Sequence, residues 1–244
     1  MDVSSDRIAI VTGAARRVGR ALAEALLDDG WAVVAHVHDA ADEVPDGTIR
    51  IVADLADPAA TAAIMAAAPG RPSLLVNNAA RFAWDGPGAF SSHEFDRHMA
   101  INLRAPVLLA EAFAALQSAS GDSLVVNLLD AKLAAPNPDY LSYTLSKAGL
   151  AAATELLARA HAAKGVRVNA IAPALMLRSP GQSDENYRAM HAHNPLHRGV
   201  EVGDIVAALR FLIAARTTTG QVLTIDSGQR FMGLARDVQF LKGE

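Results

Sequence analysis

Three residues in the second half of the chain have the types and the spacing needed for proton transfer. Tyr143 precedes Lys147 by four positions, so their side chains share one face of a helix. An ammonium group near the phenol would favour its ionised form and make Tyr143 a candidate proton donor near neutral pH. Asp130 follows the apolar run Ser123–Leu129. Because an ionised carboxylate accepts hydrogen bonds and cannot donate one to a substrate oxygen, Asp130 favours a substrate that carries N–H groups.

The same residues indicate which substrate atoms could take part. Asp130 beside Tyr143 could supply a proton to a substrate nitrogen. A substrate oxygen that becomes negative needs a hydrogen-bond donor, and an ionised aspartate does not fill that role. Alternatively, Asp130 caps the turn after the strand and has no chemical role.

A loop with the composition of a phosphate site follows the first apolar run. It contains Gly13 and Gly19 and leads into the first expected helix. Small residues let the backbone approach a phosphate, and the N-terminus of a helix offers free N–H groups and a positive dipole end. Arginine is unfavourable at this end of a helix, so Arg17 favours an anion nearby and could bridge it to an electron-rich ring. Alternatively, the glycines serve tight packing and Arg17 is a solvated side chain.

Short apolar runs alternate with longer Ala- and Leu-rich segments, which predicts a parallel sheet covered by helices on both faces. Expected strands lie near residues 7–12, 32–37, 49–52, 73–77, 123–128, 166–171 and 221–225. Expected helices lie near residues 18–29, 58–68, 92–117, 142–164 and 202–214. The segment 174–200 is polar and shows no sustained period, which is typical of a lid over a site or of a disordered segment. No linker divides the chain, so we expect a single domain over residues 1–244.

Composition limits the classes of partner. The 26 acidic residues exceed the 22 basic ones only slightly, which argues against a nucleic acid or an anionic membrane as partner. There is no cysteine, which excludes a disulfide framework, a thiolate metal site and a cysteine nucleophile. The first residues lack a signal-peptide pattern and no apolar stretch is long enough to span a bilayer, so we expect a cytoplasmic protein.

Taken together, the motifs resemble those of the short-chain dehydrogenase/reductase family over almost the whole chain. They occur in the family's order: Thr12, Gly13 and Gly19; Asp54 and Leu55; Asn77 to Ala80; Asn102; Tyr143 and Lys147; and Asn169 to Pro173. The resemblance implies an α/β fold, a Rossmann-type doubly wound parallel sheet of about seven strands with helices on both faces, together with a nicotinamide cofactor.

The resemblance also assigns roles by position. Asp54 would contact the adenine, Lys147 would bind the ribose and lower the pKa of Tyr143, and Asn102 would hold a water linked to Lys147. The expected catalytic residues are Asp130, Tyr143, Lys147 and Asn102. The expected cofactor-binding residues are Gly13, Arg16, Arg17, Val18, Gly19, His36, His38, Asp54, Leu55, Asn78, Ala79, Tyr143, Lys147 and Pro173.

Two departures from the family pattern resemble its pteridine reductase branch. Arg17 stands where the phosphate loop usually has its middle glycine, and Asp130 stands where the active site usually has a serine. Phe82 falls where this branch places an aromatic ring that sandwiches the pterin against the nicotinamide, and Tyr140 matches a second tyrosine of the branch. The expected substrate-binding residues are therefore Arg17, Phe82, Asp130 and Tyr143. Alternatively, Phe82 and Tyr140 are packing residues.

The residues after the second expected strand bear on the choice of nicotinamide cofactor. The position at which NAD-specific members carry an acidic residue falls on Val37, so that signal is absent. Arg16, His36 and His38 could hold the 2′-phosphate of NADPH, whereas Asp39 would repel it unless its carboxylate turns away. We expect NADPH, with NADH as the alternative.

The sequence therefore predicts an NADPH-dependent oxidoreductase that reduces a pterin, a dihydropterin or a similar C=N heterocycle. One alternative is a carbonyl (keto) reductase acting on another small molecule, with Asp130 working through a bound water. Another is a non-catalytic cofactor-binding protein, against which the intact Asn102, Tyr143 and Lys147 argue.

Three further expectations concern the histidines of the segment 174–200, the oligomeric state and the C-terminal tail. His191, His193 and His197 lack a carboxylate partner at fixed spacing, so we assign them to the lid and expect no metal site. The family resemblance implies a homotetramer. The apolar residues between Phe231 and Phe240 would be costly to expose, so this tail is expected to reach a neighbouring subunit or its pocket.

Overall fold

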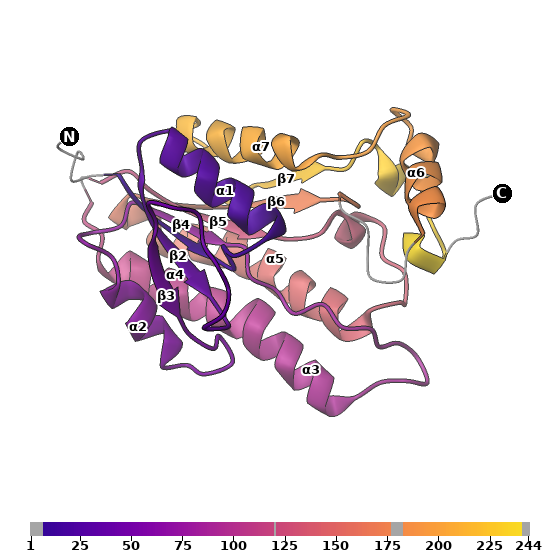
Figure 1. Cartoon of the computed structure of the whole chain (residues 1–244), viewed down its shortest axis with the longest axis horizontal. Helices are drawn as coiled ribbons and strands as arrows, with labels where there is room; N and C mark the ends of the chain where they lie inside the picture. Colours follow the sequence, from indigo (N-terminus) through magenta and orange to yellow (C-terminus); the bar gives the residue numbers. More distant parts are fainter. Residues whose placement is uncertain (1–6, 120, 177–182, 241–244) are drawn as a thin grey trace.

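A seven-stranded parallel sheet forms the centre of this computed structural model, which describes residues 7–119, 121–176 and 183–240 (Figure 1). The strands are Ile8–Thr12 (β1), Ala32–Val37 (β2), Ile49–Val52 (β3), Leu74–Asn77 (β4), Ser123–Leu128 (β5), Val166–Pro173 (β6) and Val222–Ile225 (β7). They are ordered β3-β2-β1-β4-β5-β6-β7. The chain order reverses between β1 and β4, and ligands of such sheets bind at the carboxyl ends of the strands there. The predicted α/β class and doubly wound sheet are confirmed.

Helices cover both faces of the sheet (Figure 1). On one face lie α1 (Arg17–Asp28) and α7 (Val202–Ala214), and on the other lie α2 (Ala60–Ala66), α4 (Ala105–Ala115) and α5 (Leu141–His161). Further helices are α3 (Ser92–Met99), which packs against α5, and α6 (Asp184–His193). Short helical turns occupy Ala131–Ala134, Ala162–Lys164, Gln229–Met232 and Val238–Phe240. Within the described ranges, no helix is both long and apolar enough to cross a bilayer.

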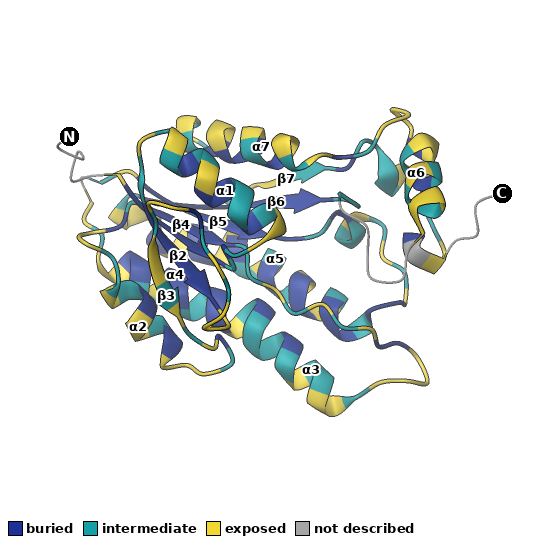
Figure 2. Ribbon diagram, in the orientation of Figure 1, coloured by how far each residue is buried: buried dark blue, intermediate teal, exposed yellow. Residues whose placement is uncertain are grey.

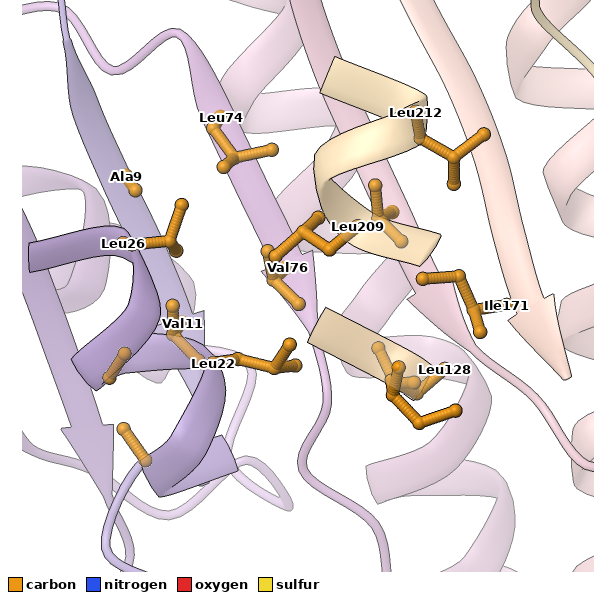
Figure 3. Packing of buried hydrophobic residues seen from close by; sticks show 14 of the residues in the cluster. Ala9, Val11, Leu22, Leu26, Leu74, Val76, Leu128, Ile171, Leu209 and Leu212 are labelled. Carbon is orange, nitrogen blue, oxygen red and sulfur yellow. The ribbon is translucent and has the colours of Figure 1, made fainter. Parts of the chain in front are cut away.

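Alternate residues of the central strands supply two apolar layers. In β1, Ala9 and Val11 pack toward α1 and α7, whereas Ile10 packs toward α2 and α4. Figure 3 shows the first layer, in which Leu22 of α1 and Leu209 of α7 meet the strands. The central strands are buried along their whole length because both faces are covered (Figure 2). This rigid base fixes the strand ends from which the site is built.

The helix expected over 92–117 is present from Ser92 to Ala115, with a change of hydrogen-bond pattern in its middle that the sequence did not reveal. A π-turn at Ala100–Arg104 separates α3 from α4, and Pro106 stands in the first turn of α4. Proline has no N–H, so residue 106 cannot give the Asn102 carbonyl its normal helical hydrogen bond. Single π-turns inside helices are frequent at functional sites. Here the π-turn contains Asn102.

The segment 174–200, expected to be an aperiodic lid, contains a helix. Ser183 accepts a hydrogen bond from the Asn186 N–H at 3.1 Å and caps α6. Of the residues of α6, Met190 is the one that is buried. Because so few side chains of this helix are buried, its sequence shows little of the hydrophobic periodicity from which helices are predicted. Residues 177–182 of the expected lid lie outside the described residues.

Candidate active site

A cleft of about 730 Å³ opens at the carboxyl ends of the strands. The predicted cofactor- and substrate-binding residues all line it: Gly13, Arg16, Arg17, Val18, Gly19, His36, His38, Asp54, Leu55, Asn78, Ala79, Phe82, Asp130, Tyr143, Lys147 and Pro173. Asn102, which was predicted to be catalytic, does not line it. The volume is in the range of small-molecule and cofactor sites.

Asp130 and Tyr143 meet within this cleft. Asp130 is the second residue after β5, and Tyr143 lies in the first turn of α5. The Tyr143 hydroxyl donates a hydrogen bond to Oδ2 of Asp130 at 3.0 Å. Oδ1 of Asp130 accepts from the Lys132 backbone N–H at 2.8 Å. The carboxylate therefore caps a turn and faces the phenol at the same time.

Lys147 lies one turn further along α5, on the same face as Tyr143. Its Nζ donates to the Leu128 carbonyl oxygen at 2.6 Å and lies 5.8 Å from the centroid of the Tyr143 ring. Burial lowers the pKa of Lys147 to about 8, although the Asp130 carboxylate opposes the shift. The ammonium group is therefore anchored by a backbone carbonyl at the end of β5.

The expected lowering of the Tyr143 pKa by Lys147 is wrong. Burial raises the pKa of Tyr143 well above its ordinary value, and the charge of Asp130 and the hydrogen bond to it add to the rise. Burial also raises the pKa of Asp130, while the hydrogen bonds from Lys132 and Tyr143 oppose that shift. Tyr143 therefore keeps its proton, as a proton donor must.

Asn102 supports the cleft from behind. Its Oδ1 accepts from the Arg81 N–H at 2.7 Å, and its Nδ2 donates to the Arg81 carbonyl and to Ser146 Oγ, each at 3.0 Å. These contacts use both hydrogens of the Asn102 side-chain amide. The expected water would therefore have to bind the main-chain carbonyl of Asn102. The side chain ties the loop after β4 to α5.

The phosphate loop has the close backbone contacts that its glycines allow. Gly13 has φ +68°, and a Cβ there would press against Ala79. A Cβ on Gly19 would collide with the carbonyl oxygen of Gly13. Nδ2 of Asn78 donates to the carbonyls of Thr12 at 2.8 Å and Gly13 at 3.1 Å, so it fixes this loop to the end of β4.

Arg17 keeps a glycine-like backbone. Its φ is +54°, in the left-handed region, although it is the first residue of α1. This conformation costs a residue with a side chain about 1–2 kcal/mol. Retained strain of this kind often marks a functional position, and the Arg17 side chain is exposed at the cleft.

His36 has a structural role that the sequence did not reveal. Its Nδ1 accepts from the Gly13 N–H at 3.2 Å, so the proton is on Nε2, which bonds to the Ala53 carbonyl at 3.0 Å. The side chain is buried, and burial lowers the pKa of His36. Both ring nitrogens are engaged, so the expected contact with a 2′-phosphate is not available to this residue.

The other residues after β2 are arranged differently. His38 is exposed at the cleft, with Nδ1 3.8 Å from Oδ1 of Asp54. Asp39 does not line the cleft, because its Oδ1 turns back to accept from the Ala41 N–H at 2.9 Å. Asp42 lines the cleft, and its Oδ2 accepts from the Asp39 N–H at 3.4 Å. The repulsion expected from Asp39 is therefore reduced.

Phe82 stands beside the Asp130 and Tyr143 pair. Its ring stacks on Tyr140 with centroids 4.2 Å apart and an interplanar angle of 18°, and it meets the Tyr143 ring edge-on at 4.8 Å. Tyr140 is buried, whereas Phe82 is 45% exposed. Since Tyr140 covers one face of Phe82, a flat ligand would have to use the other face.

The C-terminal residues of the cleft were missed by sequence reasoning. Leu234, Asp237 and Val238 line it, together with Lys132. The tail was expected to reach a neighbouring subunit or its pocket, and these three residues line the cleft of their own chain. The apolar composition of this tail was the one sequence feature that indicated it is packed against protein. The tail is anchored by Asp139, almost a hundred residues away in sequence, and no sequence motif predicts this contact.

The lid histidines are engaged with backbone carbonyls. Nε2 of His191 bonds to the Leu175 carbonyl at 3.0 Å, and none of His191, His193 and His197 lines the cleft. Among the residues that the structure describes, no group of three or more His, Asp or Glu side chains could hold a metal ion. The described lid residues that line the cleft are Ala174, Leu175 and Met176.

Replacing Gly19 by Ala should damage the phosphate loop. The added Cβ meets the Gly13 carbonyl, so the loop must shift, at a cost of roughly 1–3 kcal/mol in the free energy of unfolding. We expect NADPH binding, measured by fluorescence titration, to weaken about tenfold or more. Gly203→Ala is the control, because a Cβ there meets no atom within 4 Å. Unchanged NADPH affinity in Gly19→Ala would contradict the assignment of this loop.

The lowered pKa of Lys147 predicts a pH dependence of stability. At pH values between about 8 and 10.5 the unfolded chain holds a proton on this amine that the folded protein has released. The free energy of unfolding should therefore rise with pH, by roughly 2 kcal/mol over about 1.5 pH units above pH 8. Lys147→Met should remove this rise in urea titrations, whereas Lys164→Met, at an exposed lysine, should retain it. Equal slopes in both variants would show that Lys147 stays charged.

Comparisons with known proteins fit this arrangement. Residues 13–230 match the family model described as enoyl-(acyl carrier protein) reductase. A short-chain type dehydrogenase/reductase of Picea abies is 30% identical over 91% of this chain and 92% of its own. The L-xylulose reductase of Bos taurus is 30% identical over 91% of this chain and 96% of its own.

The fold also has solved counterparts. FolM alternative dihydrofolate reductase 1 from Brucella canis, in a crystal structure complexed with NADP, is 35% identical and superposes with a TM-score of 0.87. The match covers 94% of this chain and 96% of that one. Together with the sheet order and the spacing of Tyr143 and Lys147, these matches show that the chain belongs to the short-chain dehydrogenase/reductase family of oxidoreductases.

Proposed function

We propose that the protein is an NADPH-dependent reductase of a pterin, a dihydropterin or a similar C=N heterocycle. The observation that carries this proposal is the hydrogen bond from Tyr143 to Asp130 beside the exposed ring of Phe82. An ionised carboxylate at this place can accept from the N–H groups of a heterocycle and cannot donate to a ketone oxygen. The likeness to an alternative dihydrofolate reductase adds support for a heterocyclic substrate.

In this proposal Tyr143 is the proton donor. When bound, the nicotinamide cofactor supplies a hydride to the carbon of the C=N bond. The Tyr143 hydroxyl, whose raised pKa keeps it protonated at neutral pH, turns from Asp130 to the substrate nitrogen. Asp130 holds a neighbouring N–H of the substrate. Lys147, when charged, offsets the negative charge left on the phenol oxygen.

The cofactor would run from the phosphate loop toward Tyr143. The backbone around Gly13 and Gly19 leaves room for the pyrophosphate. Arg16 and His38 are the exposed basic groups that could bind a 2′-phosphate, and Asp39 turns its carboxylate to Ala41. The NADP complex of the Brucella canis protein agrees with this preference.

The second candidate is a carbonyl reductase. The L-xylulose reductase among the relatives favours it, since that enzyme's name implies a keto substrate. In this case Tyr143 would donate to the carbonyl oxygen directly and Asp130 would act through a water. The two candidate functions differ in how much the Asp130 carboxylate contributes to the rate of reduction.

Asp130→Ser separates the two candidates. If the substrate is a C=N heterocycle, kcat/KM for dihydrobiopterin should fall roughly 100-fold or more, because both an acceptor for the substrate and a partner of Tyr143 are lost. Reduction of a ketose such as L-xylulose should change much less, because serine can donate to a carbonyl oxygen. The rate of NADPH oxidation measures both reactions.

Tyr143→Phe is the reference for this experiment, since it should abolish both reactions. Equal losses in Asp130→Ser on the heterocycle and on the ketose would count against the heterocycle. A wild-type protein that reduces ketoses and leaves dihydrobiopterin unchanged would establish the carbonyl reductase instead.

Arg16→Ala tests the choice of cofactor. The wild-type protein should use NADPH with a kcat/KM at least about tenfold above that for NADH, because a charge-assisted contact to the 2′-phosphate contributes roughly 1.5–3 kcal/mol. Arg16→Ala should reduce this ratio, whereas Arg159→Ala, at an exposed arginine of α5, should leave it unchanged. A wild-type preference for NADH would overturn the assignment.

A further inference from the structure

Arg97 brings a positive charge to the cleft that the proposed reaction does not use. It belongs to α3, is partly buried and lines the cleft together with Ile101. The Nε atom of its guanidinium is buried and has no hydrogen-bond partner among the described residues. A buried N–H without an acceptor is costly, so this group needs an explanation.

The acidic residues nearest to Arg97 on α3 do not pair with it. Glu94 lies one turn earlier, and its carboxylate is taken by a two-pronged pair with Arg81, with both N···O distances 2.8 Å. Asp96 is exposed, and adjacent residues of a helix do not face each other. We therefore expect the partner of the Arg97 guanidinium to be a bound molecule.

The side of α3 that carries Arg97 faces the ends of β3 and β4. Ile101 lies four positions later and Arg104 seven, so the three side chains follow one side of the helical run. Ile101 packs against the apolar layer to which Ala53 and Ala79 also belong, and both of these alanines line the cleft. Arg104 donates to a carbonyl of the loop after β3. Arg97 therefore lies at the part of the cleft between the loops after β3 and β4.

The order of the strands indicates which part of a dinucleotide reaches Arg97. The phosphate loop follows β1, so the pyrophosphate would lie at the end of that strand. Asp130 and Tyr143 follow β5, beyond β4 in the sheet, so the nicotinamide would extend to that side. The adenosine half must then extend the opposite way, toward the ends of β2 and β3. This brings the adenine to the loop after β3, beside Arg97.

We propose that Arg97 is a cofactor-binding residue whose guanidinium packs flat against the adenine of the dinucleotide. A guanidinium is planar and weakly hydrated, so it stacks well on aromatic rings. The carboxylate of Asp54 lines the same part of the cleft and would repel a phosphate placed there. The inference needs a nicotinamide cofactor and holds for either candidate substrate. The remaining residues around this part of the cleft are apolar and suit a flat base: Ala53, Leu55, Ala79, Ala80 and Ile101.

Dissociation constants of NADPH and NADH test the inference without a substrate. Both cofactors carry the same adenine, so Arg97→Met should weaken the binding of each by the same factor, about fivefold or more, as for loss of a desolvated cation–π contact. Fluorescence titration measures both constants. Arg188→Met is the control, because this arginine of α6 is exposed and does not line the cleft. It makes the same change in net charge and should leave both constants unchanged.

Arg97→Lys separates stacking on the adenine from a contact with a phosphate. Lysine keeps the charge but lacks the plane, so both affinities should stay below those of the wild type. Wild-type affinities in Arg97→Lys, or a loss in Arg97→Met that is confined to NADPH, would place a phosphate against residue 97 and overturn the inference. Unchanged affinities for both cofactors in Arg97→Met would overturn it as well.

The melting temperature of the protein without cofactor shows whether weaker binding comes from damage to the fold. Because Nε of Arg97 has no partner among the described residues, Arg97→Met should keep the melting temperature near that of the wild type. A melting temperature lowered as far as in Gly19→Ala would assign Arg97 a structural role instead and overturn the inference.

Failure of this inference and failure of the proposed function give different results. None of these titrations uses a substrate, so they decide the role of Arg97 whether or not the protein reduces dihydrobiopterin. A wild-type protein that binds neither NADPH nor NADH would refute the role of Arg97 together with the choice of cofactor.

Discussion

The hydroxyl of Tyr143 reaches the carboxylate of Asp130 across 3.0 Å, in a part of the cleft where burial raises the pKa of both groups. A carboxylate removed from water needs hydrogen-bond donors, and Asp130 receives one from the phenol and one from the Lys132 backbone. These two donors come from α5 and from the turn after β5. The contact therefore requires the end of β5 and the start of α5 to be held together.

Several interactions hold them there. Lys147 binds the Leu128 carbonyl from α5, which ties the helix to the last residue of β5. Ser146 bridges Asn102 and the Tyr143 carbonyl, and Asn102 in turn binds both backbone groups of Arg81. The loop that carries Phe82 is thus fixed to the same helix as Tyr143. The π-turn around Asn102 belongs to this framework, because it sets the position of that side chain.

The two ends of the cleft are built differently. The phosphate end depends on close backbone contacts, in which Gly13, Gly19 and the side chain of Asn78 leave little freedom. The substrate end depends on side chains, with Phe82 stacked on Tyr140 and the buried Asp139 paired with Arg236 of the C-terminal segment. Side chains at the substrate end can be replaced without disturbing the backbone contacts at the phosphate end. One fold can therefore serve different substrates.

The sequence by itself determined the strands, most helices and the part of the cleft lining that lies in the family motifs, because hydrophobic periodicity and motif spacing are local properties of the chain. The π-turn at Ala100–Arg104 and the helix α6 were not visible, since one depends on a changed hydrogen-bond pattern and the other on a single buried side chain. Only the tertiary structure decided how the side chains are used. It engaged both nitrogens of His36, turned Asp39 away and placed Asp237 in the same cleft as Asp130 and Tyr143. Burial and long-range contacts set pKa values and orientation, and neither can be obtained from the order of residues alone.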